Sequence, residues 1–292
     1  MFMPKDKFNA LWVSHSSISD YLACPRSYFL KNVYKDPKTG HKITLMNPHL
    51  ALGQSVHHVL ESLSHIPYDQ RFDRSLQDRF SEAWGKVSGK QGGFFDEATE
   101  SQFRKRGEEM LARAYRNPGP LKTKAVKITS DLPQFWLSEE ESIILCGKID
   151  WLEYLPESDS VNIIDFKTGK REEEETSLQL PIYHLLVHHC QKRRVTKMSY
   201  WYLERNDFLT EQPLPDLEDS GARVLRLAQK MKVARQLGKF NCKEQDGCFA
   251  CLPMEHVING KAQYVGNDEY RRDVYVLETA TQDINSEDSV VL

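Results

Sequence analysis

Residues 163–170 of this 292-residue chain read IIDFKTGK, and this segment decides the fold. Its β-branched and aromatic residues favour a strand, in which residues i and i+2 lie on the same face. Asp165 and Lys167 are therefore expected to point to one side, while Phe166 points into a core. The Thr-Gly pair that follows predicts a sharp exit from the strand, which leaves the two charged side chains open to a ligand.

A second aspartate precedes this strand. The segment Gly147-Lys148-Ile149-Asp150 follows an apolar run, and residues 156–160 favour a turn, so we predict a β-hairpin over residues 142–167. Such a hairpin brings Asp150 beside Asp165. Two carboxylates on adjacent strands suit Mg²⁺ or Mn²⁺, which lowers the pKa of a bound water and stabilises charge on a phosphoryl oxygen. An ordinary Asp–Lys ion pair would show the same short pattern.

The other elements surround this hairpin with helices. Hydrophobic periodicity predicts helices over 16–33 with an interruption at Pro25, and over 50–64, 70–86, 97–115, 177–190 and 218–237. It predicts strands over 126–129, 142–154, 161–167 and 198–204, with a further strand within 259–277 and a loop over 37–48. This order of elements predicts a mixed α/β architecture.

Composition excludes several classes of protein. Hydrophobic residues make up 40 % and charged residues 28 %, as in ordinary globular enzymes and unlike disordered or collagen-like chains. Lys and Arg number 39 against 42 Asp and Glu, a formal charge of −3 that includes a run of four acids at 172–175. This balance argues only against bulk electrostatic wrapping of duplex DNA. No apolar run suggests a membrane span, and no phosphate loop suggests an NTPase motor.

Two of the predicted helices carry further polar candidates. His57 and His58 are adjacent on the helix over 50–64, and helical geometry alone does not choose between them. Gln179 and Tyr183 are four residues apart and therefore share one helical face. An ordinary buried polar pair would have the same spacing.

Four motifs in this order resemble the PD-(D/E)XK nuclease superfamily, in its RecB-like branch. The resemblance covers roughly residues 14–255 and implies a restriction-endonuclease-like core, in which a mixed central β-sheet is flanked by helices. It also implies a helical N-terminal part and a Cys-rich C-terminal segment. The motifs are Gly53-x-x-x-His57, Gly147-x-x-Asp150, Asp165-Phe166-Lys167-Thr168-Gly169 and Gln179-x-x-x-Tyr183.

The resemblance implies a single nuclease domain over residues 1–278. Within it we expect a helical part over about 14–120 and a catalytic sheet core over about 121–205. A helix and cluster segment follows over about 206–257, and a terminal strand over about 259–278. Residues 279–292 form an acidic tail that we expect to be disordered.

The same resemblance assigns roles to the motif residues. It implies that His57 binds the divalent metal, and a nitrogen ligand makes Mn²⁺ at least as acceptable as Mg²⁺. Lys167 would position or activate the attacking water. Gln179 and Tyr183 would border the site and orient the lysine or the DNA strand. The other implied metal ligands are Asp150, Asp165 and the backbone carbonyl of Phe166.

The cysteines indicate a second metal centre. A C-x-x-C turn beside Gly247 is a metal-binding arrangement, and we expect the six cysteines to be thiols or ligands in a cytoplasmic protein rather than disulfides. The resemblance implies a structural [4Fe–4S] cluster, with tetrahedral Zn²⁺ as the alternative. In the family the third late cysteine more often lies beyond the pair, which leaves His256 as a reserve for Cys242. The implied ligands are Cys24, Cys242, Cys248 and Cys251.

Together these features predict a divalent-metal-dependent DNA nuclease, an exonuclease acting on single strands or DNA ends, without a membrane association. A helicase or an integrase is a candidate partner, and any ATP-driven unwinding would have to come from another chain. The alternative is a catalytically silent module for DNA binding or complex assembly, in DNA repair, recombination or CRISPR adaptation. A third interpretation, an iron–sulfur redox protein, is weaker because it assigns no role to the two aspartates and the lysine of the predicted hairpin. The candidate DNA contacts are Arg193, Arg194, Arg223 and Arg226, on segments that would equally be solvated faces.

Overall fold

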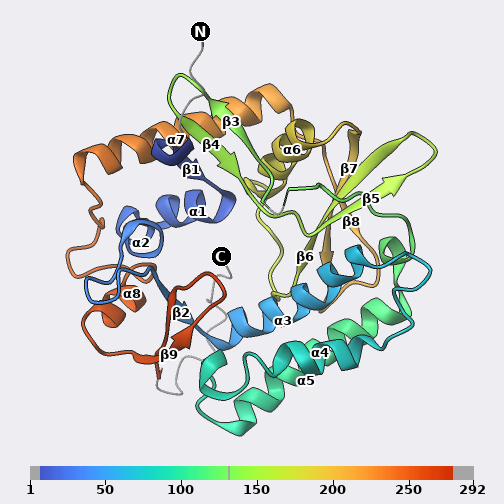
Figure 1. Ribbon diagram of the computed structural model, residues 1–292, viewed down its shortest axis with the longest axis horizontal. Helices are drawn as coiled ribbons and strands as arrows, with labels where there is room; N and C mark the ends of the chain where they lie inside the picture. The colour runs from blue at the N-terminus through green and yellow to red at the C-terminus, as the bar shows by residue number, and fades with distance from the viewer. Residues whose placement is uncertain (1–6, 131, 279–292) are drawn as a thin grey trace. The chain divides into compact units, whose positions relative to one another are not determined.

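The computed structural model describes residues 7–130 and 132–278 (Figure 1). The predicted disordered tail, 279–292, lies outside the described residues. The chain forms two compact units. Unit 1 comprises Met1–Ile18, Leu60–Asp73 and Arg113–Lys239, and unit 2 comprises Ser19–Val59, Arg74–Ala112 and Phe240–Leu292. Across residues 7–130 and 132–278, none of the helices is both long enough and apolar enough to span a membrane.

Unit 1 contains a four-stranded mixed sheet in the order β5-β6-β7-β8 (Figure 1). Strand β6 lies antiparallel to β5 and parallel to β7, and helix α6 makes the crossover and packs on both β6 and β7. Seven of the eight residues of β6 are buried, as expected for an interior strand with a parallel neighbour. The elements are β5 (Trp151–Leu155), β6 (Ser160–Lys167), α6 (Gln179–Cys190), β7 (Arg194–Tyr202) and β8 (Thr210–Gln212).

A second sheet of unit 1 has the order β1-β4-β3, with β4 parallel to β1 and antiparallel to β3. All four residues of β4 are buried, which explains why the strand is wholly apolar. Helix α7 contacts β1, β3 and α6. The elements are β1 (Leu11–Val13), β3 (Gln134–Ser138), β4 (Ile143–Cys146) and α7 (Leu217–Leu237).

Three predictions about these strands were wrong. The strand predicted over 142–154 is two strands, because β4 and β5 belong to different sheets, and the hairpin is therefore β5–β6 rather than 142–167. The strand predicted over 126–129 is absent from the described residues. This segment pairs with β5 only through the bridge between Ala125 and Glu153, and the pairing ends where the amide of Val126 donates to the carbonyl of Leu152 at 2.8 Å. The loop predicted over 37–48 contains strand β2, which pairs with β10 from the end of the chain.

Unit 2 contains the third mixed sheet, in the order β2-β10-β9, and most of the N-terminal helices. The predicted α/β fold, a mixed β-sheet flanked by helices, is confirmed, and the strands within residues 7–130 and 132–278 are distributed over three mixed sheets rather than one. The predicted terminal strand is the hairpin β9–β10. The elements are β2 (Ile43–Met46), α4 (Leu76–Trp84), α8 (Leu252–Ile258), β9 (Gln263–Asn267) and β10 (Asp273–Val276).

The helical front of the chain follows the sequence pattern, except that the helix predicted over 70–86 begins only at Leu76 of α4, because the Ser75 side chain caps it there by accepting from the amides of Gln77 and Asp78. Helix α1 (His15–Ala23) ends just before Pro25, which begins α2 (Pro25–Tyr28), so the predicted interruption is confirmed. A π-helical turn continues α2 over Phe29–Val33. Two longer helices follow, α3 (Pro48–Ser62) and α5 (Glu97–Arg116). Short 3₁₀ turns lie at Lys7–Asn9, Leu63–His65, Gly89–Gly92 and Gly119–Lys122.

Candidate active site and candidate metal centres

The C-terminal end of β6 presents the Asp-x-Lys pair as the strand alternation predicts. The ammonium nitrogen of Lys167 lies 3.1 Å from Oδ2 of Asp165, whose side chain is almost fully buried. The ring of Phe166 is also fully buried, and its centroid lies 6.4 Å from that of Trp151 and 6.1 Å from that of Trp201. The core therefore fixes the strand from its apolar side, while the charged pair occupies the other side.

Gln179 connects the pair to helix α6. Its amide nitrogen donates to Oδ1 of Asp165 at 2.7 Å and to the Tyr183 hydroxyl at 3.3 Å, and its amide oxygen accepts from Lys167. Burial, and then the Asp165 and Asp150 carboxylates, raise the pKa of the Tyr183 phenol well above its usual range. The structure therefore brings together four of the predicted residues, with a neutral phenol beside the carboxylate.

Glu173 also contacts Lys167, and the sequence reasoning did not select it. One carboxylate oxygen lies 2.8 Å from the ammonium nitrogen, and the other accepts from the Ser177 hydroxyl at 2.8 Å. Burial disfavours the charged ammonium, but Asp165 and Glu173 outweigh burial and raise the pKa of Lys167. The signal in the sequence was the acidic run at 172–175, which does not tell which acid turns inward.

His15 is a second residue of this neighbourhood that the sequence reasoning did not select. It begins helix α1, and burial together with the Lys167 charge lowers its pKa to about 4. A neutral imidazole therefore stands beside the lysine at physiological pH. Nothing in the local sequence distinguishes His15 from an ordinary residue at a helix start.

Asp150 reaches the end of β6 from the segment that precedes β5. A Cβ atom on Gly147 would come within 2.9 Å of Leu186 on α6, so this position needs the small residue to pack the segment against the helix. The Asp150 carboxylate then accepts from the backbone amide of Phe166 at 2.9 Å. The two predicted carboxylates thus lie at the same end of β6, since Asp165 directly precedes Phe166.

Helix α3 brings two further side chains with possible metal-ligand atoms close to Asp150. One ligand atom from each of His57, Glu61 and Asp150 lies within 4.8 Å of the other two, and Lys148 forms an ion pair with Glu61. His57 is half-buried one helical turn before Glu61, whereas His58 is exposed. An imidazole and two carboxylates suit a divalent cation such as Mn²⁺ or Mg²⁺, which would activate water and stabilise phosphoryl charge. In this arrangement Glu61 joins the group and Asp165 is held by Gln179 and Lys167.

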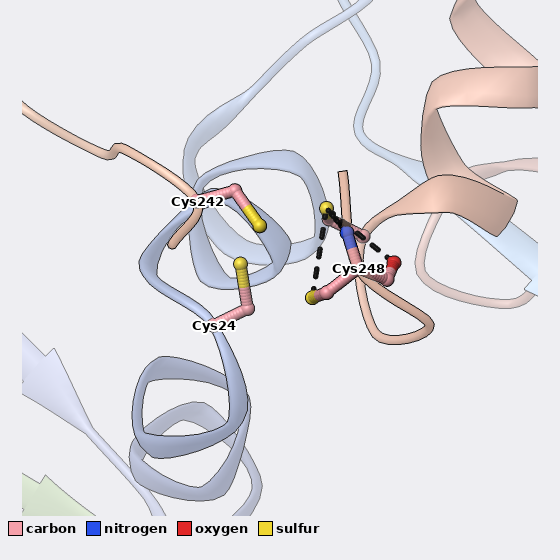
Figure 2. A group of neighbouring side chains, drawn as sticks. Cys24, Cys242 and Cys248 are labelled. Atoms are coloured by element: carbon pink, nitrogen blue, oxygen red, sulfur yellow. Dashed lines mark hydrogen bonds between the residues drawn. The ribbon is translucent and has the colours of Figure 1, made fainter. Parts of the chain in front are cut away.

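The four predicted cysteines come together within unit 2. Their sulfur atoms all lie within 4.8 Å of one another, and those of Cys248 and Cys251 are 3.8 Å apart. Figure 2 shows the side chains of Cys24, Cys242 and Cys248 directed toward one another from separate segments of the chain. His256, the reserve ligand, is not a member of this group among the described residues.

Backbone amides surround these sulfur atoms. The amide of Glu244 donates to the Cys242 sulfur at 3.4 Å, and the amide of Cys248 donates to the Cys251 sulfur at 3.3 Å. The first of these bonds lowers the pKa of the Cys242 thiol, whereas burial raises that of Cys251. Gly247 has φ +90°, a conformation that favours glycine and allows the turn before Cys248. Four sulfurs at this spacing fit a single tetrahedral metal ion, and the same donor set binds an iron–sulfur cluster at a wider spacing.

The four predicted DNA-contact arginines lie on exposed parts of unit 1. Arg193 pairs with Asp159 at 3.0 Å and lies over the Tyr154 ring at 5.0 Å. Arg223 donates to the carbonyl of Thr176 at 3.1 Å. The remaining two, Arg194 at the start of β7 and Arg226 on α7, are also exposed. Their positions are compatible with phosphate contacts and equally with solvated faces.

The mixed α/β fold and the Asp…Asp-x-Lys constellation at the end of β6 define a class of metal-dependent phosphodiester-cleaving proteins. The model of the PD-(D/E)XK nuclease superfamily matches residues 12–253, and the chain belongs to this superfamily. Proteins of the superfamily are usually nucleases that use divalent metals. A search among curated proteins found no match to the sequence.

Proposed function

We propose that this protein is a divalent-metal-dependent deoxyribonuclease of the RecB-like branch, which hydrolyses phosphodiester bonds as an exonuclease on single strands or DNA ends. The observation that carries the proposal is the connected set of Asp150, Asp165, Lys167 and Gln179 at one end of β6. A module that only binds DNA has no need for an ammonium held against a buried carboxylate. The cytoplasm is the compartment that we expect for it.

Each side chain of the candidate active site would have its own role in the reaction. His57, Glu61 and Asp150 would hold the divalent cation, Mg²⁺ or Mn²⁺, with Asp165 and the Phe166 carbonyl as further oxygen ligands. Lys167, protonated and held at one position, would orient the attacking water or stabilise negative charge on the phosphate. Gln179 would hold both Asp165 and Lys167 in place, and Tyr183 would act as a neutral hydrogen-bond donor.

We further propose that Cys24, Cys242, Cys248 and Cys251 hold a structural [4Fe–4S] cluster. Tetrahedral Zn²⁺ is the alternative, and one observation favours it. Zinc–sulfur bonds of about 2.3 Å place tetrahedral sulfurs about 3.8 Å apart, and the Cys248 and Cys251 sulfurs are separated by 3.8 Å. Visible absorption with bound iron and inorganic sulfide would establish the cluster. A colourless protein with one equivalent of zinc would establish the alternative.

The nuclease proposal is tested with purified protein and labelled single- and double-stranded DNA, with Mn²⁺, Mg²⁺ or EDTA. We expect metal-dependent cleavage, and we expect Asp165→Ala or Lys167→Ala to reduce the rate about 10²–10³-fold or more while the protein stays folded. Lys170→Ala is the matched control, because Lys170 is exposed three residues beyond Lys167. Undiminished cleavage by both site variants, or none by the wild type, would contradict the proposal.

The second candidate is a catalytically silent DNA-binding or assembly module. The exposed arginines of unit 1 would support DNA binding in such a module, just as they would in a nuclease. The same assay separates the two functions, because a silent module would shift labelled DNA in a gel without shortening it. A requirement for an added helicase or integrase would appear as cleavage only in the presence of the partner.

A further inference from the structure

Glu173 is the one residue of the acidic run at 172–175 that is not exposed. Its backbone amide donates to the Tyr202 hydroxyl at 3.1 Å, and its carboxylate accepts from the Ser177 hydroxyl at 2.8 Å. Tyr202 is the last residue of β7 and is buried. The rigid sheet therefore holds the backbone of Glu173, and Ser177 fixes the direction of its side chain toward Lys167.

The ammonium group of Lys167 has three N–H donors, and three oxygen atoms surround it, one of them through an ion pair with Asp165. These are Oδ2 of Asp165 at 3.1 Å, Oε2 of Glu173 at 2.8 Å and the amide oxygen of Gln179. The side chain of Lys167 is only 18 % exposed. Each partner comes from a different element: Asp165 from β6, Glu173 from the loop after it and Gln179 from the start of α6. Three partners from different elements define one position for a long and otherwise flexible side chain.

From these contacts we infer that Glu173 is a positioning residue of the active site, which acts through Lys167 and does not bind the metal. This inference rests on the proposed nuclease function. Without Glu173 the ammonium keeps the hydrogen bond to Gln179 and the ion pair with Asp165 but gains rotational freedom, so it occupies its working position for a smaller fraction of the time. Misplacement of a catalytic group by about 1 Å costs on the order of 10²-fold in rate.

The test compares Glu173→Gln, Glu173→Asp and Glu175→Gln with the wild type. Glu175 is the matched control, because it lies in the same acidic run, is exposed and loses the same charge on substitution. On labelled single-stranded DNA with Mn²⁺, Glu173→Gln should lower kcat about 10–100-fold and leave KM within about twofold. Glu173→Asp should recover part of kcat, and Glu175→Gln should match the wild type.

Mn²⁺ titration of the same proteins supplies a readout that does not depend on cleavage. Mn²⁺ should bind Glu173→Gln within about threefold of the wild type, since His57, Glu61 and Asp150 are retained and only a neighbouring charge is lost. Mn²⁺ binding weakened about tenfold or more, as expected for the loss of a ligand, would make Glu173 a ligand and overturn the inference. An unchanged or raised kcat would make the contact with Lys167 neutral or inhibitory and would also overturn it. An equal fall in kcat for Glu175→Gln would show that the loss of rate comes from the lost charge in general, and this result would also overturn the inference about Glu173.

The same experiments separate this inference from the proposed function. If the wild type never cleaves DNA, both are overturned. If the wild type cleaves DNA and Glu173→Gln is unaffected, only the inference about Glu173 is overturned.

Discussion

Replacement of Cys248 by alanine tests whether the four-cysteine group stabilises the fold. A metal centre held by the group would link Cys24 to Cys242 and enclose 242 − 24 = 218 residues. In the chain-entropy model a cross-link over such a loop destabilises the unfolded chain by about 5 kcal/mol. The Cys248 side chain is also buried against apolar neighbours. We therefore expect the free energy of unfolding of Cys248→Ala to fall by about 3–5 kcal/mol, with loss of the bound metal.

The assay is urea unfolding followed by far-ultraviolet circular dichroism, with visible absorption and bound metal measured on the same samples. Cys190→Ala is the matched control, because Cys190 is partly buried in α6 and lies outside the group, with its sulfur 3.6 Å from the carbonyl of Gln134. This control removes the same atom and should cost about 1 kcal/mol. If the two variants unfold at the same urea concentration, or if metal-free wild type is as stable as the metal-bound protein, the cysteine group does not stabilise the fold.

Three further predictions concern individual contacts. His57→Ala should weaken Mn²⁺ binding about tenfold or more, measured by titration, while His58→Ala should leave it unchanged because His58 is exposed. Gln179→Glu places an oxygen where the amide nitrogen donates to Asp165 at 2.7 Å, and should lower the free energy of unfolding by about 2–3 kcal/mol in a urea titration and suppress cleavage; wild-type stability would contradict this. Burial opposes the ionisation of Asp273, but hydrogen bonds from Thr39, His41 and Asn267 prevail and lower its pKa. Its stabilising contribution is therefore present above the unfolded pKa of about 3.9 and is lost as pH falls through the lower folded value. Asp273→Asn should be about 1–3 kcal/mol less stable at pH 7, and the difference should shrink between pH 4 and pH 2; a difference that is constant with pH would show that ionisation of Asp273 is not involved.

Local patterns in the sequence predicted the elements that local physics governs. The alternation along β6 places Asp165 and Lys167 together and Phe166 in the core, because side-chain direction in a strand follows from backbone geometry alone. The break before Pro25 was equally predictable, since the proline ring is tolerated at a helix start and not in its interior. The grouping of Cys24 with the late cysteines depended on the resemblance, because no local rule joins residues so far apart in sequence.

Features that depend on tertiary pairing were not predictable. β4 and β5 are both short apolar runs separated by four residues, and only the pairing of β4 with β1 and β3 assigns them to different sheets. β2 is a strand because β10, at the other end of the chain, lies beside it. In the acidic run, Glu173 differs from its neighbours only through contacts with Tyr202, Ser177 and Lys167, none of which the run itself encodes.

The charges at the end of β6 favour the binding of a cation at this site. Glu61, Asp150, Asp165 and Glu173 contribute four negative charges, and Lys148 and Lys167 contribute two positive ones, so the formal balance is −2. The pKa of His15, about 4, leaves that imidazole neutral. Partly buried carboxylates without compensation are costly, and a phosphodiester that approached them would be repelled. A single divalent cation restores neutrality and gives the phosphate a positive partner, which is why we place metal binding before DNA binding in the proposed reaction.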